Sequence, residues 1–182
     1  MNAAHLTLMP PPSEPRLPPS GFPGAPQRAA ATRRAITSLA HEPFGAQVEL
    51  HLATCRRHGV GMGVTWIRLL GLAEIGERHG LGAQRQLVES VQQRLQGRLR
   101  HVDKVCAVAL DTFGVALFDV REPVVPGIER RLHRELSSPY RIGGEIVQLQ
   151  VLVGSALSPQ SNHNAVELMR QAADASSVAQ RA

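Results

Sequence analysis

The sequence predicts an α/β sandwich in which helices flank a central, mainly antiparallel sheet. Apolar runs with the spacing of strands alternate with amphipathic helical stretches over residues 45–182, and two neighbouring runs are separated only by a short turn. The chain has 182 residues, 43% of them hydrophobic, which suffices for one ordinary domain with a buried core and an additional tail. These observations alone indicate the fold class.

The first 27 residues differ from the rest in composition, because eight of the 13 prolines lie there. A segment rich in Pro, Gly and Ser cannot build a core, so residues 1–27 are predicted to be a disordered or extended tail that acts as a linker or tether. Residues 28–44 are expected to be a linker with a short helix over 28–40. The domain itself is expected to span 45–182.

The first half of the domain is predicted to contain a helix, a strand, a short helix and a long helix. Residues 45–58 form the first helix, and the apolar stretch Gly61–Leu70 forms the strand. A short helix over 72–79 ends before a glycine, which is a common helix terminator. The long helix covers 83–100, because apolar residues recur there every four positions, namely Leu87, Val91, Leu95 and Leu99.

The second half of the domain is predicted to contain a hairpin, a crossover helix and a further strand. Two apolar runs surround Asp111-Thr112, which is a hairpin pattern, and residues 125–136 form a helix with Ile128 and Leu132 turned inward. A strand is expected over 146–157 after the turn at Gly143-Gly144. One face of that strand carries alternate apolar residues, namely Val147, Leu149, Val151 and Val153.

Residues 164–178 form the last predicted helix, with Asn162 or Asn164 as the N-cap. The order is therefore β-α-α-β-β-α-β-α. Crossover helices around a central hairpin indicate a sandwich of the ferredoxin or nucleotidyl-cyclase type.

The charge is basic, at +5, and all but one of the 20 basic residues are arginine. Arginine is suited to forked contacts with phosphate, although an arginine excess also arises from genomic base composition. Aromatic residues are only 3% of the chain and no helix-turn-helix is present, so nucleic-acid binding is disfavoured.

Cysteine and histidine spacing shows no zinc pattern, so no metal site and no cofactor are expected. The sequence contains no apolar run long enough for a membrane span, and Met1–Pro12 does not resemble a secretory leader. We therefore expect a cytoplasmic protein.

Several short segments fall at characteristic separations. Arg100-His101-Val102-Asp103 precedes Ala109–Phe113 by a short strand, Gly154 follows a branched residue in the last strand, and Ala173-Asp174 lies in the last helix. Between the first strand and the long helix, Leu72, Ile75 and Gly80 fall at scaffold positions. In order and spacing these segments resemble the GGDEF domain, the catalytic domain of bacterial diguanylate cyclases. The resemblance covers roughly residues 45–182.

The resemblance also implies that the catalytic residues are missing. The family holds two magnesium ions with carboxylates, but the first-strand ligand position here is Arg68. The five signature positions carry no glycine pair, and only the third keeps a carboxylate; they are Ala109, Leu110, Asp111, Thr112 and Phe113. The positions that contact guanine are Gly76 and Arg85. We therefore predict a degenerate domain without cyclase activity.

Arg68 and Asp111 take the places of two residues that share a metal in the family. A guanidinium can supply the positive charge of that metal. We accordingly expect Arg68 and Asp111 to face each other across adjacent strands, within about 4 Å or bridged by one water.

In the family, the Arg-x-x-Asp element is the inhibitory site for cyclic di-GMP. The resemblance assigns ligand contacts to Arg100 and Asp103, with Arg130 or Arg131 contributing from the following helix. The alternative is that Asp103 caps the loop before the strand and that Arg100 is a solvated helix end.

Two functions remain open at this point. The first is a cyclic di-GMP receptor or signalling module. The second is a module for protein–protein interaction or homodimerisation that has no nucleotide ligand.

Overall fold

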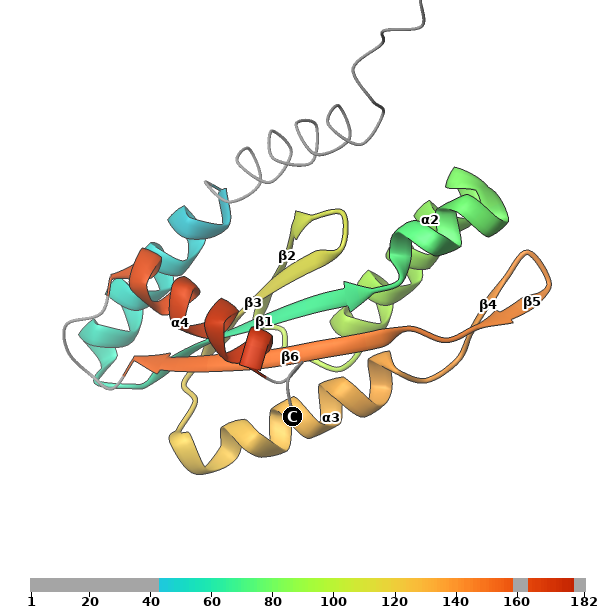
Figure 1. Cartoon of the computed structure of the whole chain (residues 1–182). Coiled ribbons are helices and arrows are strands. Elements are labelled where there is room, and N and C mark those ends of the chain that lie inside the picture. The colour runs from blue at the N-terminus through green and yellow to red at the C-terminus, as the bar shows by residue number, and fades with distance from the viewer. Residues whose placement is uncertain (1–42, 159–163, 179–182) are drawn as a thin grey trace, which may run out of the picture.

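The computed structural model describes residues 43–158 and 164–178. The predicted tail over 1–27 and the predicted helix over 28–40 lie outside these residues. A four-stranded sheet in the order β2-β3-β1-β6 forms the centre of the described part (Figure 1). All its neighbouring strands are antiparallel, so the predicted fold class is confirmed.

Strand β1 (Met62–Leu70) is central and pairs on one side with β3 (Thr112–Phe118) and on the other with β6 (Gln150–Ser158). The short strand β2 (Lys104–Ala109) pairs with β3. Strands β2 and β6 are therefore the two edges of the sheet.

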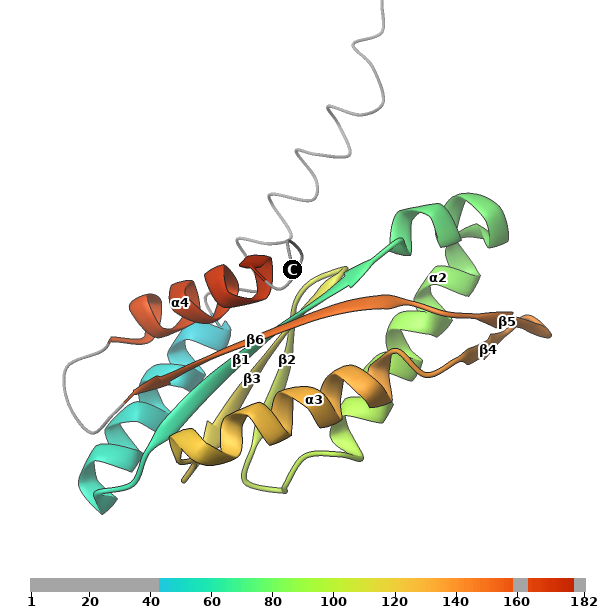
Figure 2. The same ribbon diagram turned by 60° about the horizontal axis from the view of Figure 1, so that its bottom comes forward.

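Helices cover both faces of the sheet, and each face has its own core. The helix over 43–58 and α4 (Ala165–Val178) pack on one face, whereas α2 (Leu72–Gln96) and α3 (Val125–Leu136) lie on the other (Figure 2). Because successive strand residues point to opposite faces, Trp66 belongs to the first core and Ile67 to the second. None of the helices in the described ranges is both long and apolar enough to span a bilayer.

The two predicted helices after β1 form one element that is interrupted at Gly80, whose φ of 84° and ψ of 162° are not helical. The predicted periodicity is confirmed, since Leu87, Val91 and Leu95 are fully buried. Their helix ends at Gln96, a few residues before the predicted end.

The expected strand over 146–157 is wrong in its first part. Gly143 and Gly144 both have positive φ and turn the chain, so β4 (Tyr140–Ile142) and β5 (Glu145–Val147) pair in a small separate hairpin. Strand β6 begins only at Gln150. The apolar alternation nevertheless has the predicted consequence, because Val147, Leu149, Val151 and Val153 all contact the same core.

Two polar side chains fix helix ends. Asn164 Oδ1 accepts the backbone N–H of Glu167 at 2.8 Å, which confirms Asn164 as the N-cap of α4. At the end of α3, the Arg94 guanidinium donates to the carbonyl oxygens of Glu135, Ser138 and Pro139 and lies 3.7 Å above the Tyr140 ring. Arg94 thereby joins α2, the α3 terminus and the small hairpin.

Candidate functional site

The β2–β3 turn meets the start of α2 around a small cavity of about 200 Å³. Its lining includes Leu110 and Asp111 from the turn, together with Ala73, Glu74 and Gln84 from α2. The cavity lies below the range of roughly 300–1,000 Å³ that is usual for small-molecule sites.

The five signature positions follow the predicted hairpin, with the turn at Leu110-Asp111. Phe113 is fully buried in the core, and Thr112 is 8% exposed and donates to Asp111 Oδ1 at 3.0 Å. Leu110 is 44% exposed beside the cavity, and Ala109 ends β2. Residues 109–113 therefore form a hairpin turn beside the small cavity, and three of their five side chains are apolar.

The predicted ion pair between Arg68 and Asp111 is wrong. The β1–β3 register places Arg68 opposite Thr112, and it is the neighbouring Leu69 N–H that donates to the Asp111 carbonyl at 2.8 Å. Arg68 makes no ion pair within 4 Å in the described part of the chain. Strand alternation turns Arg68 to the same sheet face as Trp66, while Asp111 belongs to the turn.

The side chain of Gln84 occupies the space beside Gly76, one of the two positions that the resemblance assigns to guanine contacts. A Cβ on Gly76 would lie 2.8 Å from Nε2 of Gln84, and this Nε2 donates to the Leu72 carbonyl at 2.9 Å. Gln84 is only 8% exposed, whereas the neighbouring Arg85 points to solvent. Sequence reasoning missed Gln84, although it precedes Leu87 by three residues on the buried face of the same helix.

A second cavity, of about 440 Å³, lies where α2 ends and α3 begins. Arg100, Asp103 and Arg131 line it together, as the Arg-x-x-Asp prediction requires, and Arg121 joins them from the loop after β3. Arg130 is exposed and is absent from this lining, so of the two candidate arginines it is Arg131 that borders the cavity. Sequence reasoning missed Arg121, because its proximity depends on the path of the loop between β3 and α3.

The Asp103 carboxylate is already surrounded by donors. Its side chain is 3% exposed and accepts the backbone N–H groups of Arg100 at 3.0 Å and Phe118 at 3.2 Å. The Arg100 guanidinium also donates to it, at 3.3 and 3.4 Å, and to the Phe118 carbonyl oxygen. Asp103 therefore ties the α2–β2 loop to the end of β3, as the capping alternative predicts.

The charges around this cavity are predominantly positive. Arg131 donates to the Arg98 carbonyl. The Arg100 side chain is 55% exposed and Arg131 is also exposed, so solvent reaches both residues. With Arg121 they outnumber the two carboxylates of the lining, Asp103 and Asp119. The arrangement favours an anionic ligand.

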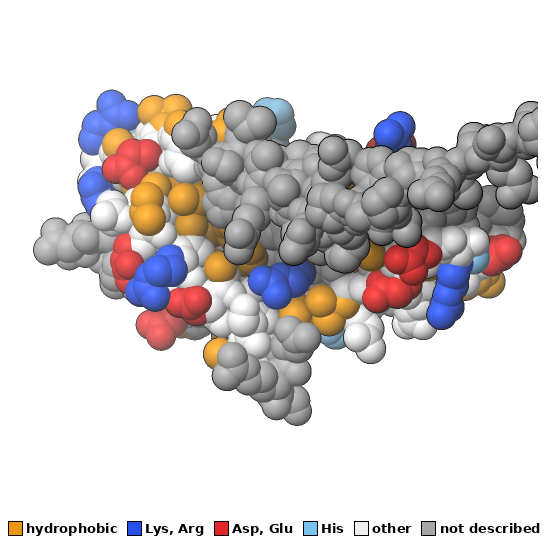
Figure 3. All heavy atoms as spheres, turned by 45° about the horizontal axis from the view of Figure 1, so that its top comes forward, with side chains coloured by type: hydrophobic (Ala, Val, Ile, Leu, Met, Phe, Trp, Pro, Cys, Tyr) orange, Lys and Arg blue, Asp and Glu red, His pale blue; other side chains and the backbone are white. Residues whose placement is uncertain are grey.

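Elsewhere the described surface has mixed charge. The face shown in Figure 3 has Lys or Arg side chains interspersed with acidic and hydrophobic ones. Within the described ranges, no three His, Cys, Asp or Glu side chains are arranged so that they could hold a metal ion.

Neither Cys55 nor Cys106 lines the two cavities. Burial raises the pKa of Cys55 and that of Cys106, so both remain protonated at neutral pH.

Comparison with known proteins agrees with this geometry. The family model described as "Diguanylate cyclase, GGDEF domain" matches residues 36–182. The cyclic di-GMP phosphodiesterase NbdA of Pseudomonas aeruginosa is 27% identical over 122 residues, which are 67% of this chain and 16% of that protein. The chain thus spans less than a fifth of the curated relatives that it matches.

Solved structures show the same fold. The GGDEF domain of YfiN (TpbB) from P. aeruginosa has a TM-score of 0.70 at 24% identity, covering 76% of this chain and 81% of that chain. The GGDEF domain of DgcB from Caulobacter crescentus, solved in complex with c-di-GMP, has a TM-score of 0.69 at 14% identity, covering 77% and 84%. With the family model matching most of the sequence, the chain belongs to the GGDEF domain family.

Proposed function

We propose that this chain is a catalytically inactive GGDEF domain that binds cyclic di-GMP in the cavity of Arg100, Arg121 and Arg131. The supporting observation is that three arginine residues line one cavity of about 440 Å³, at the Arg-x-x-Asp element. Cyclic di-GMP carries two phosphates and two guanine edges. Arginine forks match both groups, and the cavity volume falls within the usual range for ligand sites.

Binding in this mode requires a rearrangement of Arg100. Its guanidinium now donates to Asp103 and to the Phe118 carbonyl. Turning it toward a phosphate frees lone pairs on Asp103 for guanine N–H groups. The backbone donors of Arg100 and Phe118 keep the carboxylate in place during this change.

The proposal of inactivity rests on the chemistry of three side chains. Arg68 is a cation at a metal-ligand position, Thr112 lacks a carboxylate, and Leu110 places a branched side chain beside the small cavity. Two-metal phosphoryl transfer needs carboxylates that hold both ions and a close approach of the triphosphate to the backbone.

The first prediction is that the protein does not convert GTP to cyclic di-GMP with either Mg²⁺ or Mn²⁺. The measurement is chromatographic detection of product, with an active diguanylate cyclase as the positive control in the same buffer. Product above the protein-free blank would disprove inactivity, and it would leave the binding proposal untouched.

The second prediction concerns the ligand. Arg100→Ala should weaken cyclic di-GMP binding by about 1.5–3 kcal/mol, the range for a hydrogen bond to a charged group, as measured by calorimetry. Arg130→Ala is the matched control, because Arg130 is an exposed arginine of the same helix as Arg131 that does not line the cavity. Equal losses in the two variants would contradict the site assignment.

A second candidate function is supported by the hydrogen bonds of Asp103. Since four donor atoms already surround its carboxylate, Arg-x-x-Asp is also explained as a structural tie, in a module that binds a protein partner or forms a homodimer without nucleotide. Calorimetry of the wild-type chain with cyclic di-GMP distinguishes the two functions, since the interaction module gives no binding heat. Either function is compatible with the cytoplasmic location that we propose.

A further inference from the structure

The two edges of the central sheet differ in how they are protected. Exposed strand edges invite pairing with other chains, and proteins blunt them with short strands, lysines and bulges. Strand β2 has all three features, since it is six residues long, begins with Lys104, and shifts register between Ala107 and Ala109. Strand β6 has none of them.

Strand β6 is nine residues long and pairs with β1 without a register shift from Gln150 to Ser158. It contains no charged residue and no proline. Its outer side has no strand neighbour in the part of the chain that the structure describes. On that side, no described residue outside the sheet forms a backbone hydrogen bond with β6, and an added strand would pair with these donors and acceptors.

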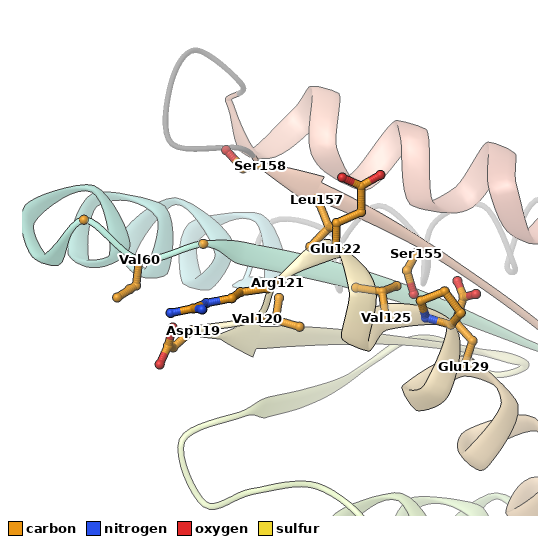
Figure 4. A pocket seen from close by; sticks show the side chains of 13 residues that line it. Val60, Asp119, Val120, Arg121, Glu122, Val125, Glu129, Ser155, Leu157 and Ser158 are labelled. Carbon is orange, nitrogen blue, oxygen red and sulfur yellow. The ribbon is translucent and has the colours of Figure 1, made fainter.

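A hollow of about 720 Å³, larger than either cavity above, borders the end of β6. Ser155 and Leu157 of β6 form one wall, Val125 at the start of α3 forms the opposite wall, and Val60 and Val120 contribute apolar surface (Figure 4). Side chains on one face of an added strand would enter this hollow, because alternate residues of a strand point to the same side.

The rim of the hollow is acidic on the side of α3. Neither the Glu122 nor the Glu129 carboxylate forms an ion pair or hydrogen bond in the described residues. The Arg121 side chain extends toward Asp119, at the other end of the hollow (Figure 4). Two unpaired carboxylates therefore remain beside a free strand edge.

We propose that β6 and this hollow bind an extended basic segment of a partner protein, which adds a strand to the sheet. The backbone of the segment pairs with the outer edge of β6, and its arginine or lysine side chains reach Glu122 and Glu129. The free edge determines the extended conformation of the partner, and the carboxylates determine its charge. The hollow shares Asp119, Val120 and Arg121 with the Arg100 cavity, but neither β6 nor the Glu122 and Glu129 carboxylates line that cavity.

The test uses the 182-residue protein and a fluorescent peptide of about ten residues, close to the length of β6, that alternates Val and Thr and carries two Arg on one face. We expect saturable binding by fluorescence anisotropy and slower hydrogen exchange of backbone amides in 150–158. The same peptide N-methylated at alternate amides cannot pair with a strand edge and should not bind. A peptide with Glu in place of Arg should bind at least about fivefold more weakly.

Two double variants distinguish an effect of the Glu122 and Glu129 carboxylates from an effect of the overall charge of the protein. The double variant Glu122→Gln with Glu129→Gln should bind the Arg peptide about five- to tenfold more weakly, which is the effect of losing two partly exposed charge pairs. Glu77→Gln with Glu89→Gln removes the same charge from exposed positions of α2 and should have no effect.

Three results would overturn the proposal. The first is no saturable binding of the Arg peptide, and the second is equal binding of its N-methylated form. The third is dimerisation of the protein in the absence of peptide, seen by sedimentation, together with protection of the β6 amides from hydrogen exchange. A second copy of the chain would then be the occupant of this edge.

Discussion

Gly154→Ala is expected to lower the free energy of unfolding by at least about 3 kcal/mol. A Cβ at this position of β6 would lie 2.0 Å from the backbone N of Ser176 and 2.5 Å from the carbonyl carbon of Ala175. Both atoms belong to the backbone of α4, so no side-chain rotation can relieve the overlap, and the helix must move off the sheet. Chemical denaturation monitored by circular dichroism measures the loss.

Gly127→Ala is the matched control for that substitution. Gly127 lies in α3, and a Cβ there meets no atom within 4 Å. Replacing glycine in an open helical position should stabilise the protein by about 0.5–1 kcal/mol, because alanine loses less backbone entropy on folding. An unchanged midpoint for Gly154→Ala would mean that α4 does not pack on β6 as described.

Asp103→Ala is expected to destabilise the protein by about 3 kcal/mol, the second largest effect. The change removes a side chain that is 3% exposed and leaves the partly buried backbone N–H groups of Arg100 and Phe118 without their charged acceptor. Thermal unfolding should show a decrease in midpoint of about 10 °C, given the usual relation between free energy and midpoint in a domain of this size.

Arg100→Ala provides the comparison for Asp103. The Arg100 side chain is more than half exposed, and its removal leaves the carboxylate with both backbone donors, so the destabilisation should be within about 1 kcal/mol. Equal stability losses in the two variants would contradict the role of Asp103 as the tie between loop and strand. The comparison also establishes whether Arg100→Ala is folded enough for the binding measurement.

Local patterns in the sequence were sufficient for most helices and strands. The four-residue repeat of Leu87, Val91 and Leu95 predicted the long part of α2, because the helical period is a property of a single segment. The hairpin around Asp111 was predicted for the same reason, as was an N-cap at Asn162 or Asn164, of which the structure shows Asn164. The resemblance to GGDEF domains likewise depended on spacings along the chain, and the family match bears it out.

The wrong predictions concern side-chain direction and pairing between segments. Arg68 was placed beside Asp111 from family positions, but strand alternation turns it to the face that carries Trp66. The strand expected over 146–157 was predicted from alternation alone, which does not distinguish one strand from a hairpin followed by a strand.

What the sequence by itself determined is the fold class, the residue identities at 109–113, and the presence of Arg-x-x-Asp, because each of these is written in residue identity and local spacing. Only the tertiary structure decided that Arg121 and Arg131 border the cavity of Arg100 while Arg130 does not, and that Gln84 fills the space over Gly76. It also decided that β6 is an edge strand of the sheet in the described residues and lies beside Glu122 and Glu129. These are contacts between residues distant in sequence, and they depend on chain path and packing, which no local pattern encodes.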